Sequence, residues 1–249
     1  MSDRSPPPLR ELIGDGNDWA LFLDFDGTLV ALAARPDAIQ VPRELPALLR
    51  RLERVFDGAL AILSGRALRD LDRYLPGLKL PASGQHGVEC RFEAHRDATV
   101  MDASALEAIR SGIHTFASRI PGLLVEDKGA SIALHYRAAP DAEAAVRHQV
   151  DVWVAASRGA LEYVDGKCLR EIHPAGVDKG AALRMFLDEP VFRGRRPLVL
   201  GDDVTDEAAF DAAHTLDGAA LKVGAGDSHA DWRLQSPACA RDWLAEVEG

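Results

Sequence analysis

Two aspartates, Asp24 and Asp26, stand one residue apart, directly after the apolar run Leu21–Leu23 and directly before Gly27 and Thr28. An apolar run of this kind suits a buried parallel strand, and open α/β sheets place their ligands at the carboxyl ends of such strands. Two neighbouring carboxylates repel each other and are costly to desolvate, so they persist most readily around a cation or a transferred group. The spacing therefore predicts a strand that ends in metal or group-transfer chemistry.

Three further polar clusters follow apolar runs or open a helix. They are Ser64-Gly65, Lys179 and Asp202-Asp203. Taken singly, a serine-glycine turn, a lysine in a first helical turn and a Gly-Asp-Asp loop are common structural features. If the strands are parallel, however, their carboxyl ends meet along one edge of the sheet. The sequence therefore predicts one pocket that gathers most of these side chains.

The elements around the clusters change in kind along the chain. Over residues 1–100 and again over 174–249, short apolar runs alternate with helical spacing, which predicts an α/β fold with a doubly wound parallel sheet. Over residues 101–173 the pattern is helix, hairpin, helix, hairpin, with helices predicted over 104–120 and 141–156. We therefore predict a core in two sequence segments, interrupted by an inserted α+β domain.

Composition excludes several classes of protein. With 29 basic and 39 acidic residues the net charge is -10, so the surface should repel nucleic acid and anionic membranes. The three cysteines lie far apart, which predicts neither a disulfide framework nor a zinc site. No signal peptide and no apolar run of about 18 residues is evident. We expect a cytoplasmic monomer whose first ten residues are frayed, with neither nucleic acid nor membrane as a partner.

The motif DFDGT at residues 24–28 resembles the opening motif of the haloacid dehalogenase superfamily of phosphohydrolases. The clusters at Ser64, Lys179 and Asp202 follow in the order of that family's other motifs. The resemblance implies that Asp24 attacks phosphorus to form an aspartyl-phosphate, and that Asp26 acts first as acid and then as base. It also implies that Ser64 and the backbone near Gly65 bind the phosphate, while Lys179 offsets negative charge.

The same resemblance implies a Mg²⁺ cofactor. Its protein ligands would be one oxygen of Asp24, the main-chain carbonyl of Asp26, and Asp202. Asp203 and Asp206 would then act mainly by supporting these ligands.

Further stretches narrow the resemblance to the trehalose-6-phosphate phosphatase family. They are ILSGR, GQHGVE, VEDKGASIALHYR, GVDKGAAL and GDDVTDEAAF, in the expected order. The resemblance implies that the inserted domain is a cap whose polar residues Glu126, Lys128, Arg137 and Glu171 bind the sugar. A sugar rich in hydroxyls requires directional donors and acceptors, which agrees with these residue types. The chain departs from the family at His173, where lysine or arginine is frequent.

The expected partner is thus a small sugar phosphate, and the expected reaction releases phosphate from trehalose 6-phosphate. Alternatives are a phosphatase for another glycosyl phosphate, such as sucrose phosphate or mannosyl-phosphoglycerate, and a sugar phosphotransferase or mutase. A binding module without turnover is a further alternative. We interpret His86 and His135 as structural residues.

Overall fold

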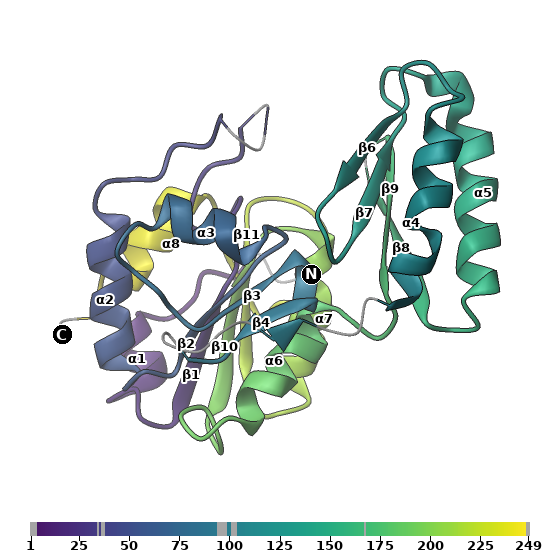
Figure 1. Cartoon of the computed structure of the whole chain (residues 1–249). Helices are drawn as coiled ribbons and strands as arrows, with labels where there is room; N and C mark the ends of the chain where they lie inside the picture. The colour runs from purple at the N-terminus through teal and green to yellow at the C-terminus, as the bar shows by residue number, and fades with distance from the viewer. Residues whose placement is uncertain are drawn as a thin grey trace. The chain divides into compact units, whose positions relative to one another are not determined.

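The computed structural model describes residues 4–33, 35, 38–93, 99–100, 104–166 and 168–247 (Figure 1). The chain forms two compact units, one of Met1–Ala98 with Asp178–Gly249 and one of Thr99–Val177. The first limit predicted for the inserted domain, residue 101, lies outside the described residues. The second, residue 173, falls within the last strand of the second unit, β9 (Leu169–Pro174).

A parallel sheet forms the centre of the first unit. Its central strand β1 (Trp19–Leu23) is buried throughout and pairs in parallel with β10 (Arg196–Gly201) and β2 (Leu60–Leu63). Beyond these lie β11 (Ala219–Val223) and β12 (Trp232–Leu234) on one side, and β3 (Ala82–Gly84) and the antiparallel β4 (Glu89–Arg91) on the other. The carboxyl ends of β1, β2 and β10 therefore lie on one side, as the chain's apolar runs predict.

Helices cover both faces of this sheet (Figure 1). On one face α1 (Leu9–Ile13), α2 (Leu45–Val55), α3 (Leu68–Tyr74) and α8 (Pro237–Leu244) pack against the odd-numbered side chains of β1. On the other face α6 (Lys179–Asp188) and α7 (Glu207–His214) pack against its even-numbered side chains. Because both faces are buried, the strand is apolar at every position, and this explains why its sequence shows no alternation.

The expectation that the first ten residues are frayed is wrong for those that the structure describes. Leu9 is fully buried in the core. The indole Nε1 of Trp243 donates a 2.8 Å hydrogen bond to the Pro7 carbonyl, and the backbone N–H of Arg233 donates one of 3.0 Å to the Arg4 carbonyl. The segment is therefore held by partners more than 200 residues away in sequence.

The second unit is a four-stranded antiparallel sheet with two helices on one face (Figure 1). In chain order the strands of this sheet and its helices are α4 (Ser104–Ala117), β6 (Leu124–Asp127), β7 (Ile132–His135), α5 (Glu143–Ala156), β8 (Leu161–Gly166) and β9. The short strand β5 (Thr99–Val100) belongs instead to the eight-stranded sheet, next to β4. The sheet order is β6-β7-β9-β8. Ile132, Leu134 and Ile172 pack with apolar residues of α4 and α5. The predicted class, an α/β fold with a parallel sheet and an α+β insertion, is confirmed.

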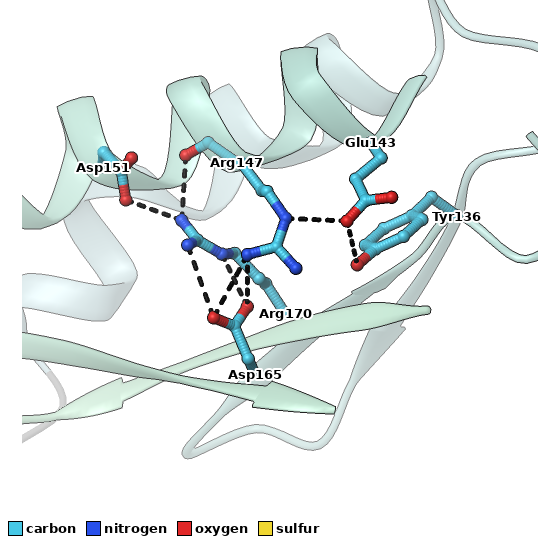
Figure 2. A network of polar contacts seen from close by, with 6 residues as sticks. All are labelled: Tyr136, Glu143, Arg147, Asp151, Asp165 and Arg170. Carbon is cyan, nitrogen blue, oxygen red and sulfur yellow. Dashed lines mark hydrogen bonds and ion pairs between the residues drawn. The ribbon is translucent and has the colours of Figure 1, made fainter. Parts of the chain in front are cut away.

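Arg170 of β9 connects the helix α5 to the sheet of the second unit through hydrogen bonds (Figure 2). Its guanidinium donates to Asp151 at 2.6 Å and to the main-chain carbonyl of Arg147 at 3.0 Å, and its Nε donates to Asp165 at 2.8 Å. Because successive residues of a strand point to opposite faces, the next residue, Glu171, lies on the face without helices.

The described residues also include the short 3₁₀ turns η2 (Gln85–Gly87), η3 (Pro140–Ala142) and η4 (Val204–Asp206). None of the helices in the described part of the chain has the length and apolar character needed to cross a membrane.

Two helical glycines give a matched test of packing. We predict that Gly180→Ala lowers the free energy of unfolding by about 1–3 kcal/mol, since extra volume in a packed contact forces backbone shifts. The new Cβ would lie 2.3 Å from the Ala208 carbonyl oxygen of α7.

Gly112→Ala in α4 should raise stability by about 0.5–1 kcal/mol, because alanine is the better helix former. Its nearest neighbour would be Trp153 Nε1 at 3.7 Å. Urea unfolding followed by circular dichroism checks both; destabilisation by both would show that close approach is not the cause.

Candidate active site

Asp24 lies immediately after β1, and the residue is only 5% exposed. Its backbone N–H donates to the Leu200 carbonyl of β10 at 2.9 Å, which fixes the residue between the two strand ends. One carboxylate oxygen, Oδ1, accepts a hydrogen bond from Lys179 Nζ at 2.7 Å. The other, Oδ2, is buried and has no hydrogen-bond partner among the described residues. Asp24 thus presents one anchored oxygen and one that is available to a ligand.

Lys179 is the first residue of α6 and is also buried. Asp178 caps this helix by accepting a 2.6 Å hydrogen bond from the Ala181 N–H. The ammonium group bridges two carboxylates, donating to Asp24 and, at 2.6 Å, to Asp206 Oδ1. Although burial alone would lower the pKa of Lys179, its two acidic neighbours raise it above the ordinary range. The lysine therefore stays charged across the physiological range of pH.

Asp206 supports the loop after β10. Its Oδ2 accepts hydrogen bonds from the backbone N–H groups of Asp202 and Asp203, each at 3.0 Å. With Lys179 on Oδ1, both carboxylate oxygens of Asp206 are engaged by the protein. Lys222, a buried lysine of β11, donates to the main-chain carbonyl of Asp202. These contacts fix the backbone from which the Asp202 side chain projects.

Asp202 completes an acidic group with Asp24 and Asp206, in which the three carboxylates place oxygens within 4.8 Å of one another. Burial raises the pKa of Asp24 well above its usual value, and burial together with the charge of Asp206 raises that of Asp202 to about 6. A Cβ on Gly27 would lie 2.0 Å from Asp202 Oδ2, so only glycine leaves room for this approach.

This arrangement fits a divalent cation. Among the described residues, Lys179 pairs with two of the three clustered carboxylates, Asp24 and Asp206, and the buried oxygen Asp24 Oδ2 accepts no hydrogen bond. Hard oxygen ligands of this kind suit Mg²⁺, Ca²⁺ or Mn²⁺ better than softer metals. A bound cation would offset the burial of these carboxylates and the repulsion between them, which together raise the pKa values of Asp24 and Asp202.

Asp26 is half-buried and belongs to a separate ion pair. Its two carboxylate oxygens accept hydrogen bonds from Arg66 Nε at 2.6 Å and Arg66 Nη2 at 2.7 Å. The guanidinium also lies 4.8 Å from the centre of the Tyr74 ring. Such a two-pronged pair fixes the orientation of both side chains.

The loop after β2 carries Ser64 and Gly65. The Ser64 hydroxyl oxygen accepts a 3.1 Å hydrogen bond from the Arg66 N–H, and the residue is 1% exposed. The His86 N–H donates to the Ser64 carbonyl at 3.0 Å. A Cβ on Gly65 would lie 2.6 Å from the His86 ring, so the imidazole covers this glycine. His86 itself has φ +57, a strained backbone for a residue other than glycine.

In the second unit, Lys128 and Glu171 form an ion pair on the face of the sheet that lacks helices. Lys128 Nζ donates to Glu171 Oε2 at 2.8 Å, and the Ser131 hydroxyl donates to Oε1 at 2.6 Å. Glu171 is 6% exposed, whereas Lys128 is half-buried.

The other two residues predicted in this unit lie outside that pair. Glu126 accepts a 2.8 Å hydrogen bond from His135 Nε2, and this contact, with Lys128 and the His135 charge, lowers its pKa despite some burial. Arg137 is exposed beyond the end of β7. In the strand register, Ala133 of β7 pairs with Glu126 of β6 on one side and with Glu171 of β9 on the other. Paired residues point to the same face of a sheet, so both carboxylates lie on the face that also carries Lys128.

Sequence reasoning did not assign a role to two residues that the structure brings into the site, Arg66 and Thr28. The Thr28 hydroxyl lies 3.4 Å from Asp202 Oδ1. Each stands inside a motif already singled out, since Arg66 ends ILSGR and Thr28 ends DFDGT. Membership of these motifs was the available sequence signal, whereas the partners of the two side chains could not be deduced from the sequence.

Comparisons with family models, curated proteins and solved structures agree on one protein family. A family model described as trehalose-phosphatase matches residues 22–238. A probable trehalose-phosphate phosphatase of Sinorhizobium fredii is 39% identical over 219 residues, 87% of this chain and 82% of the relative. The trehalose-6-phosphate phosphatase of Escherichia coli is 37% identical over 246 residues, 96% and 90% of the two chains. A solved trehalose-6-phosphate phosphatase related protein superposes with a TM-score of 0.74 at 28% identity, covering 91% of this chain and 95% of that one.

The acidic group makes a prediction about stability without metal. The pKa of Asp202 is about 6 in the folded protein and 3.8 as its ordinary value, so the folded state binds this proton more tightly. The free energy of unfolding of the metal-free protein should therefore fall as pH rises through this interval. At neutral pH, Asp202→Asn should raise the melting temperature of the metal-free protein.

Addition of MgCl₂ or MnCl₂ should stabilise the wild type by about 2.7 kcal/mol at a hundredfold excess over the dissociation constant, and the variant much less. Thermal unfolding with and without metal measures both effects. Equal metal-dependent stabilisation of the wild type and the variant would exclude Asp202 as a ligand.

Proposed function

Since the chain belongs to the trehalose-phosphatase family, we propose that it hydrolyses trehalose 6-phosphate to trehalose and inorganic phosphate. The observation that supports this most directly is the hydrogen bonding of the two carboxylate oxygens of Asp24. One oxygen is anchored by Lys179, while the other is buried without a hydrogen-bond donor among the described residues. This is the arrangement that a carboxylate nucleophile requires, because an oxygen already engaged in hydrogen bonds attacks poorly.

In the proposed first step, an oxygen of Asp24 bonds to phosphorus as the bond from phosphorus to the sugar oxygen breaks. Asp26 supplies the proton that the departing sugar oxygen needs. In the structure both oxygens of Asp26 accept from Arg66, so Asp26 must exchange at least one of these bonds when it carries the proton. Lys179 holds the nucleophile and offsets the charge that gathers around the transferred group.

In the proposed second step, Asp26 takes a proton from water as the water oxygen attacks phosphorus. The bond between phosphorus and Asp24 then breaks, which frees phosphate and restores the carboxylate. The Ser64 hydroxyl and the backbone N–H of Gly65 are proposed to hydrogen-bond the phosphate oxygens. Ser64 can do so because its oxygen accepts from the Arg66 N–H, which leaves the hydroxyl proton free to donate.

We propose Mg²⁺ as the cofactor, held by Asp24, Asp202 and the main-chain carbonyl of Asp26. When bound, it supplies positive charge close to the transferring phosphoryl group. Mg²⁺ suits this site because the acidic group carries excess negative charge and offers only oxygen atoms as ligands.

For the sugar, we propose Glu126, Lys128, Arg137 and Glu171 as the recognising residues. Glu126, Lys128 and Glu171 share one face of the sheet in the second unit and offer both donors and acceptors. Sugar hydroxyls can both donate and accept, so this mixture suits them. We propose that the enzyme works as a monomer in the cytoplasm.

The substrate is tested by phosphate release from a panel of sugar phosphates with MgCl₂. We expect the highest kcat/KM on trehalose 6-phosphate, at least about tenfold above glucose 6-phosphate, since sugar contacts separate the two. The panel should include sucrose phosphate and mannosyl-phosphoglycerate. Equal rates on trehalose 6-phosphate and glucose 6-phosphate would refute the proposal, as would transfer of labelled phosphate to a second sugar with little free phosphate.

The nucleophile is tested by Asp24→Asn. This variant should lose at least about 10³-fold in kcat while keeping its circular dichroism spectrum, because an amide cannot form the covalent intermediate. Asp178→Asn is the matched control, since asparagine caps a helix as well as aspartate and α6 should keep its position. Its activity should stay within about twofold of the wild type. Retained turnover in Asp24→Asn would place the nucleophile elsewhere.

A further inference from the structure

The hairpin turn from Asp127 to Ser131 joins β6 to β7 and carries Lys128. Within the turn, the Lys128 N–H donates to the Ser131 carbonyl at 3.0 Å, and the Gly129 N–H donates to Asp127 Oδ1 at 2.9 Å. Gly129 has φ +89, which residues with a side chain rarely adopt. The turn is therefore shaped by hydrogen bonds among its own residues, but these bonds alone do not fix it to the rest of the unit.

Arg110 of α4 supplies that attachment from the helix side. Its Nη2 donates to the Gly129 carbonyl at 2.6 Å, and its Nη1 donates to the carboxylate of Asp127. Its Nε donates to Glu107 on the same helix at 2.7 Å, which orients the guanidinium. One planar group thus holds the residues immediately before and after Lys128.

Lys128 itself reaches Glu171, with Nζ and Oε2 separated by 2.8 Å. A lysine side chain has four rotatable bonds, so its ammonium is well placed only if its backbone is fixed and its partner is constant. Glu171 is constant because the Ser131 hydroxyl holds its other oxygen. The remaining requirement, a fixed backbone at Lys128, is met by Arg110.

We propose that Arg110 is a positioning residue for sugar recognition, which acts by holding the turn that places Lys128. This inference rests on the proposed role of Lys128 in binding the sugar. Arginine suits the task because its fork of donors binds a carboxylate and a carbonyl at once, whereas lysine presents a single ammonium. Loss of Arg110 leaves the fold of the unit in place and lets the turn move.

The same unit contains a matched control. Arg147 of α5 pairs with Glu143 on its own helix at 2.8 Å and with Asp165 of the sheet at 3.3 Å (Figure 2). Arg110 likewise pairs with one acid of its own helix and one of the sheet. Asp165 is also held by a second arginine, Arg170, at 2.8 Å, whereas the second basic neighbour of Asp127, His114 Nε2, lies 3.7 Å away. Removal of Arg147 therefore deletes a similar ion pair without releasing the turn of Lys128.

The test is a double-mutant cycle on the full chain with MgCl₂, using Arg110→Gln, Lys128→Ala and their combination, and Arg147→Gln as control. Each variant is assayed on trehalose 6-phosphate and on p-nitrophenyl phosphate, which has no sugar. Arg110→Gln should lower kcat/KM for trehalose 6-phosphate by about tenfold and for the small ester by less than about twofold. In the Lys128→Ala background it should cost no more than about twofold further, because both changes remove one function. Arg110→Lys should lie between wild type and Arg110→Gln.

Additive losses in the cycle, equal losses on both substrates, or an equal loss in Arg147→Gln would each overturn the role of Arg110. Melting temperatures of the two glutamine variants show whether they destabilise the unit to the same degree. If the wild type instead prefers another sugar phosphate, the proposed function fails by itself. The same cycle on that preferred sugar then decides the role of Arg110.

Discussion

The buried contact of Lys179 with two carboxylates is the interaction on which the site depends. Asp24 follows β1 and Asp206 follows β10, and the ammonium from the start of α6 joins them at 2.7 and 2.6 Å. Charges taken out of water cost several kcal/mol each unless they are paired. This requirement forces three separate chain segments to converge, and glycines make it possible. A Cβ on Gly201 would lie 2.3 Å from Asp206 Cγ, so the strand end admits the carboxylate only because no side chain occupies that position.

In the proposed function, the two units have different roles, which follow from the kind of group that each presents. The first concentrates charge, which suits the proposed transfer of a charged phosphoryl group. The second presents a face where Glu171 and Lys128 already satisfy each other. Such a face favours neutral, hydroxyl-rich molecules, which can insert into an existing pattern of donors and acceptors without leaving a charge unpaired.

The convergence of Asp24, Lys179 and Asp202 could be predicted from the sequence, because a topological rule brings the carboxyl ends of parallel strands together. Which side chains form hydrogen bonds with one another could not be predicted in this way. Arg66 lies 40 residues from Asp26, and nothing in their spacing shows that the two pair. The helix α1 was missed for a related reason: it has five residues, and its burial depends on contacts such as that of Trp243 with Pro7. Local pattern thus predicts where side chains gather, whereas tertiary packing decides which of them touch.

The candidate site residues are, in several cases, already paired with protein groups, and this affects how a ligand can be selected. Asp26 is engaged by Arg66, and Glu171 is engaged by Lys128 and Ser131. A ligand that binds here exchanges partners, since each bond it breaks must be replaced by one of its own. A sugar with hydroxyls in the wrong places breaks the existing pairs and replaces only some of them, which leaves a half-buried charge unsatisfied at a cost of about 1–3 kcal/mol for each lost bond. If these residues bind the sugar as proposed, selection against wrong sugars arises from the stability of the empty site as much as from attraction to the right sugar.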